Sequence, residues 1–63
     1  METGWLVEIF GVGQPKWLTV DGSGFSWTID SIQALRFSRK MDAEMVAGVF
    51  HILKPIVTEH QWS

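Results

Sequence analysis

The sequence contains no cysteine and no tyrosine, and it has no apolar run close to the roughly 20 residues that span a bilayer. Without cysteine, neither a disulfide-stabilised scaffold nor a thiolate metal site can form. The amino terminus also lacks a basic segment leading into an apolar one, so we predict no secretion signal. These absences favour a cytoplasmic protein.

Positive charge is scarce as well. The sequence has five Lys and Arg and seven Asp and Glu. The resulting net charge of −2 provides no general attraction to nucleic acid or an anionic membrane. The length of 63 residues allows one small domain, residues 1–63, with one hydrophobic core. In so short a chain apolar burial barely offsets the entropy of ordering, and oligomerisation is the remaining common remedy.

The chain is rich in large apolar side chains, including four Trp and four Phe, so disorder is not expected. Residues 5–10 (Trp5 to Phe10) predict a strand, and the glycines and proline of residues 11–15 predict a turn after it. Residues 16–20 predict a second strand, and Asp21 to Gly24 predict a tight reversal. Residues 25–29 form either a third strand or an extended connection.

The middle of the chain predicts a capped turn and then the main helix. Asp30 can cap a helical turn over residues 31–34, because its carboxylate accepts hydrogen bonds from unpaired amides at a helix start. Residues 35–37 continue as extended chain. We expect the main helix to begin at Ser38 or a neighbour, with Asp42 and Glu44 near its first turn, where the helix dipole favours negative charge. Lys54-Pro55 ends it.

The inward face of this helix follows from its spacing. Four residues fall at i, i+3, i+4 and i+7 and therefore share one face: Ala43, Val46, Ala47 and Phe50. Residues 56–62 are β-prone and predict a last strand. The fold class is therefore α+β, a small antiparallel sheet with one main helix packed on one face, in a ββαβ-like order.

The second half of the chain, from Trp27 to Trp62, contains a pattern that consists of Trp27-Thr28, Asp30, Ala34, Arg36-Phe37, Asp42-Ala43-Glu44, Val46 and Glu59-His60-x-Trp62. This pattern resembles that of small, mostly uncharacterised proteins encoded by bacteriophages and prophages. The resemblance implies a ββαβ-like fold, a phage or bacterial origin and the cytoplasm of a bacterial host. It implies no catalytic residues and no cofactor.

Candidate chemical motifs are weak. The Gly11 to Lys16 segment lacks the Gly-Lys-Ser/Thr ending of a phosphate-binding loop, so a hairpin turn is favoured. His51, Glu59 and His60 could supply metal ligands, but Glu59 and His60 are adjacent and would point to opposite faces of a strand. No nucleophile motif surrounds any Ser or Thr. We predict no enzyme, no metal site and no cofactor.

The tryptophans indicate a contact surface. One helix covers one face of the sheet, and the predicted strands are apolar on both faces, so we hypothesise that the uncovered face binds another protein. The hypothesis assigns this contact to Trp5, Val7, Trp17 and Trp62, in a homodimer or on a host protein. The competing interpretation is that the tryptophans wrap around the edges of one small core.

An alternative function is nucleic-acid binding by a small regulator. Arg36, Arg39 and Lys40 form the basic cluster of the sequence, and aromatic residues nearby could stack on bases. The acidic net charge weighs against it, because phosphate contacts supply most of the non-specific affinity for nucleic acid.

Overall fold

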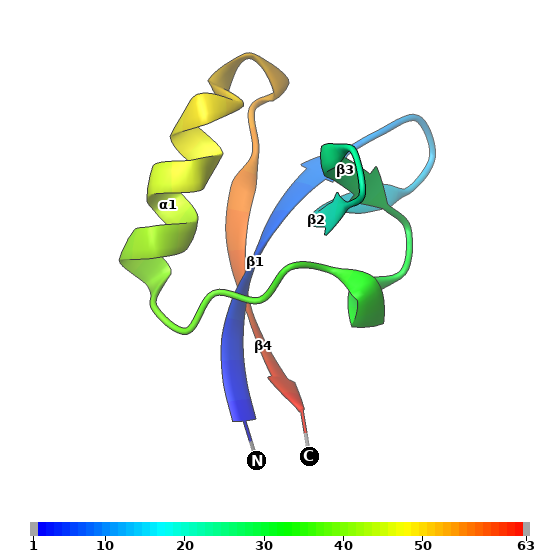
Figure 1. Cartoon of the computed structure of the whole chain (residues 1–63). Coiled ribbons are helices and arrows are strands. Elements are labelled where there is room, and N and C mark those ends of the chain that lie inside the picture. The colour runs from blue at the N-terminus through cyan, green and yellow to red at the C-terminus, as the bar shows by residue number, and fades with distance from the viewer. Residues whose placement is uncertain (1, 63) are drawn as a thin grey trace.

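Four strands, one α-helix and two short 3-10 turns make up the structure, a computed structural model that describes residues 2–62 (Figure 1). The strands form one antiparallel sheet in the order β3-β2-β1-β4, and α1 packs against it, which confirms the predicted α+β class. In chain order the elements are β1 (Glu2–Phe10), β2 (Pro15–Asp21), β3 (Gly24–Thr28), η1 (Ser31–Gln33), α1 (Lys40–Val49), η2 (His51–Leu53) and β4 (Ile56–Trp62).

The two predicted reversals are present. β1 pairs with β2 across the turn at residues 11–14, in which Gly13 has a φ of 84° that favours glycine. The Asp21 carboxylate accepts hydrogen bonds from the amide and hydroxyl of Ser23 and so closes the β2–β3 turn. Residues 24–28 form a true third strand, because they pair with β2 along its length from Trp17 to Asp21.

β1 and β2 are the two inner strands, and the register of β1 with its neighbours decides which residues share a face. Residues directly opposite each other in an antiparallel pair lie on the same face of the sheet. Val7 is opposite Val57 of β4, and both pack in the helix-side core. Glu8 is opposite Trp17 of β2, and Glu2 is opposite Trp62 of β4. Trp17 and Trp62 therefore lie on the face away from the helix.

The core between sheet and helix contains the predicted inward face of α1. Ala43 and Ala47 are buried against Val7 and Leu18. Partly buried side chains surround this cluster: Trp5, Trp27, Phe37, Val46, Phe50 and Val57. The predicted helical spacing of Ala43, Val46, Ala47 and Phe50 is thus confirmed.

The helix itself is shorter than the sequence predicts. The α-helical hydrogen bonding ends at Val49, and the chain continues through the 3-10 turn η2 before Lys54 adopts a left-handed conformation ahead of Pro55. A helix often tightens into 3-10 geometry in its last turn. No helix within residues 2–62 is long and apolar enough to cross a membrane.

The segment between η1 and α1 fills an opening in the sheet. β1 and β2 are paired only from Trp17 towards the turn, and beyond that point residues 35–37 occupy the space between them. The Leu35 amide donates to the carbonyl of Leu18, while Phe37 and Trp5 exchange two backbone hydrogen bonds of 2.8 and 2.9 Å. The Asp30 carboxylate caps η1 by accepting from the Ile32 amide, as predicted.

This arrangement covers much of the second face of the sheet. Figure 1 shows α1 on one side of the β1–β4 ribbon and η1 with the β2–β3 hairpin on the other. Leu6 lies on the face away from the helix and is nevertheless 0% exposed, and Glu8 on the same face is 9% exposed. The expected open sheet face is therefore wrong at β1, because side chains on both faces of this strand are buried.

Candidate interaction surfaces

A row of aromatic side chains crosses the sheet on the face away from α1. The Nε1–H of Trp17 donates to Glu8 Oε1 over 2.9 Å. The ring of Trp17 meets His60 edge to face, and His60 in turn stacks on Trp62 at a centroid distance of 6.0 Å. Arg36 lies over the ring of Trp62, with its guanidinium carbon 3.9 Å from the ring centroid. We call these five residues the aromatic row.

Gly4 makes the end of this row possible. A Cβ atom at this position would lie 2.9 Å from Cζ3 of Trp62, closer than Cβ atoms approach other groups in proteins. Glycine lets the indole ring lie directly over the backbone of β1, next to the Cβ of Arg36. The aromatic row is therefore built from a backbone position as well as from side chains.

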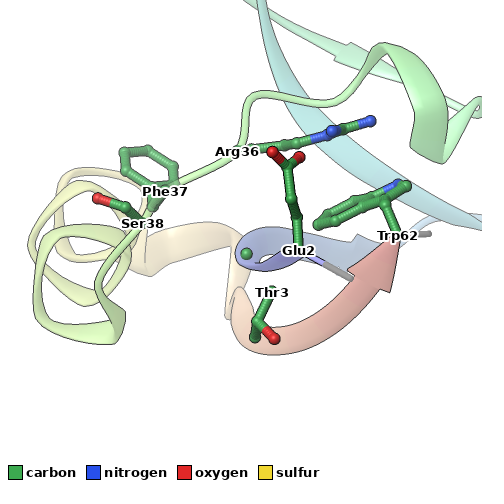
Figure 2. Close-up of a pocket in the computed structure, with 7 residues that line it drawn as sticks. Glu2, Thr3, Arg36, Phe37, Ser38 and Trp62 are labelled. Carbon is green, nitrogen blue, oxygen red and sulfur yellow. The ribbon is translucent and has the colours of Figure 1, made fainter.

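A shallow groove of about 350 Å³ opens beside this end of the row. Glu2, Arg36 and Trp62 gather at one end of it and Phe37 and Ser38 at the other (Figure 2). The guanidinium of Arg36 could attract an anion, but the carboxylate of Glu2 lines the same groove and offsets its charge. The groove is also open to solvent, whereas small-molecule sites bury most of their ligand.

Of the four predicted contact residues, two lie on the helix side. Val7 is 0% exposed and belongs to the core cluster, so its assignment to a contact surface is wrong. The physical reason is the register, which turns Val7 and Trp5 towards α1. Trp5 is half-buried against that core, and the ammonium of Lys40 lies 5.6 Å from its ring centroid.

Trp17 and Trp62 do lie on the face away from the helix, where both are half-buried in the aromatic row. The structure thus divides the four predicted residues between two faces. A role of Trp17 and Trp62 in protein contacts stays a prediction.

The three basic residues of the alternative hypothesis each have a partner within the chain. Arg36 stacks on Trp62, and Arg39 forms a bidentate ion pair with Asp42 at 3.1 and 3.2 Å. Lys40 lies over Trp5. Exposed cations with intramolecular partners are less available to phosphate groups, so the geometry gives nucleic-acid binding no added support.

The candidate metal ligands do not converge. His51 lies in η2 and hydrogen-bonds the Gly48 carbonyl, while Glu59 and His60 are consecutive on β4. Register places Glu59 opposite Trp5 and His60 opposite Gly4, hence on opposite faces of the sheet. Within residues 2–62, no group of three or more potential ligands comes together.

Several residues of the pattern in the second half of the sequence have structural roles. Asp30 caps η1, Ala34 and Ala43 are buried, and Arg36 stacks on Trp62. These residues hold the connection between β3 and α1 in place.

The outer face of α1 is apolar and exposed. Its residues are Met41, Met45, Gly48 and Val49, and the exposed Ile52 follows in η2. The large side chains among them are 66%, 70%, 74% and 83% exposed, in chain order. Met41, Met45 and Val49 follow each other at intervals of four, so they form one stripe along the helix, opposite Ala43 and Ala47.

Sequence reasoning missed this stripe, although its signal was present. The spacing of four between Met41, Met45 and Val49 is as regular as the spacing of the inward residues. A count of apolar residues over the whole helix would have shown two opposite apolar faces, of which a single sheet can bury only one.

Comparisons with protein-family models, with curated proteins and with solved structures find no match to this chain.

Proposed function

We propose that this chain is a small protein-interaction module of phage or bacterial type, acting in the bacterial cytoplasm by binding and not by catalysis. Its partner is a second copy or a host protein. The contact surface is the outer face of α1, in place of the sheet face that the sequence indicated. The observation that carries the proposal is the exposure of three large apolar side chains in one stripe along α1, followed by the exposed Ile52.

Physical chemistry supports a contact at this face. Monomeric proteins rarely expose large contiguous apolar patches, and such patches mark interaction sites. Two of the side chains are methionines, whose flexible thioethers adapt to partner surfaces. A helix with an exposed apolar stripe is also the form in which helices dock into grooves of other proteins.

The absence of cysteine from the sequence permits a direct test. Single-cysteine variants Met45→Cys and Val12→Cys are alkylated with iodoacetamide, as purified protein over a range of concentrations and in concentrated bacterial extract. Val12 is the matched control, because it is fully exposed in the β1–β2 turn, away from α1 (Figure 1).

The proposal predicts slower alkylation at position 45 than at position 12 when a partner is present. Protection that appears as the purified protein is concentrated indicates self-association, and protection only in extract indicates another protein. Equal alkylation rates at both positions under all conditions would show that the outer face of α1 binds nothing, and the proposal would fail.

A further inference from the structure

The outer face of α1 has the shape of a self-complementary surface. Resting on the proposed function, we infer that its occupant is a second copy of this chain, bound with the two α1 helices antiparallel across a two-fold axis. In such a dimer the same surface of both copies forms the contact.

The order of large and small residues along the stripe fits this symmetry. If the two-fold axis passes midway between Val46 and Ala47 along the helix, Met45 of each copy lies opposite Gly48 of the other. The same axis brings Met41 opposite Ile52. The space next to the Cα atom of Gly48 is empty in the single chain, since a Cβ atom there would meet nothing within 4 Å. The methionine side chain of one copy thus enters the space that the glycine of the other leaves.

Charge does not oppose the contact. The stripe contains no charged residue, and Lys40 and Glu44 flank it at the edge of the proposed contact. In the proposed register these two residues lie opposite Leu53 and Val49, so no like charges are brought together.

The available area also fits a dimer. The exposed area of Met41, Met45, Val49 and Ile52 is on the order of 500 Å² per copy, so a symmetric pair could bury about 1,000 Å² in total, which is the lower end of specific interfaces. A chain of 63 residues has a small core, so burial of this area is the kind of stabilisation it lacks by itself.

Sedimentation equilibrium tests the inference over protein concentrations from about 1 μM to about 1 mM, the range that detects weak to moderate dimers. The proteins are the wild type, Met45→Lys, Gly48→Ala and the control Val12→Lys. We expect a wild-type dimer and an unchanged dissociation constant for Val12→Lys. Met45→Lys removes two apolar side chains from each interface, one per copy, and should raise the dissociation constant at least about a hundredfold.

Gly48→Ala separates a packing effect from a folding effect. Alanine favours a helix over glycine, so the monomer should become more stable to urea. The added methyl fills the space for Met45 of the other copy, so the dissociation constant should rise about tenfold or more. A dimer that Gly48→Ala and Met45→Lys leave intact would overturn the inference.

A wild type that remains monomeric throughout would overturn it as well. The proposed function would survive that result if Met45→Cys were still protected in bacterial extract. Protection in neither setting would refute both.

Discussion

Gly4→Ala should destabilise the protein, although the same change in a strand interior normally stabilises by about 0.5–1 kcal/mol. The new Cβ atom would lie 2.9 Å from Cζ3 and 3.4 Å from Cη2 of Trp62, so the rigid ring must move. Displacement forfeits the stacking of Arg36, about 0.5–1 kcal/mol at an exposed site. It also re-exposes on the order of 50 Å² of apolar surface, about 1.3 kcal/mol.

Set against the gain from alanine, the expected net loss is about 1 kcal/mol, which lowers the melting temperature by about 4–8 °C in a domain of this size. Urea denaturation followed by circular dichroism measures it. Gly22→Ala is the control, because a Cβ atom at Gly22 meets nothing within 4 Å. In a Trp62→Leu background Gly4→Ala should instead show the ordinary gain of about 0.5–1 kcal/mol, giving a coupling energy of about 1.5–2 kcal/mol. If Gly4→Ala stabilised the protein as much as Gly22→Ala does, the packing of Trp62 over β1 would be refuted.

Three further predictions concern hydrogen bonds that the structure defines. Trp17→Phe leaves the largely buried carboxylate of Glu8 without its indole donor, and urea denaturation should show a loss of about 1–3 kcal/mol that Glu8→Leu partly restores. Asp30→Ala removes the cap of η1 and should cost about 1 kcal/mol in thermal unfolding, whereas Asp30→Asn should cost little. The hydrogen bonds from the hydroxyl and the amide of Ser23 lower the pKa of Asp21 below 3.8. The stability advantage of the wild type over Asp21→Asn should therefore be constant from neutral pH down to pH 3.8 and shrink as pH falls further, in urea titrations at each pH.

Local features of the fold were predictable because each depends on a few neighbouring residues. The cap at Asp30 follows from one side chain and the amides next to it. The inward face of α1 follows from the helical period, which needs no knowledge of the sheet. The turns at residues 11–14 and 21–24 follow from the preference of glycine and aspartate for reversals.

The two faces of β1 were not predictable in the same way. Leu6 and Val7 are neighbours that point in opposite directions, and both are 0% exposed. Alternation in the sequence therefore carries no information about which of them meets the helix. That choice depends on the pairing of Glu8 with Trp17, which the geometry of the intervening turn sets, and on residues 35–37, which enter the sheet from a distant part of the chain.

The orientation of α1 depends on the volume of its side chains as well as on their hydrophobicity. Met41 and Met45 are as apolar as the residues that face the sheet, yet Ala43 and Ala47 are the ones buried. The rings of Trp5, Trp27 and Phe37 pack against the same cluster, and the small side chains at the centre of the inward face let the helix approach the sheet. Two methionines turned inward would overpack this core, at a cost of typically 1–3 kcal/mol for each insertion. Folding thus accounts for the alanines and leaves the outward methionines unexplained, and a surface that folding does not explain is where a binding role is to be sought.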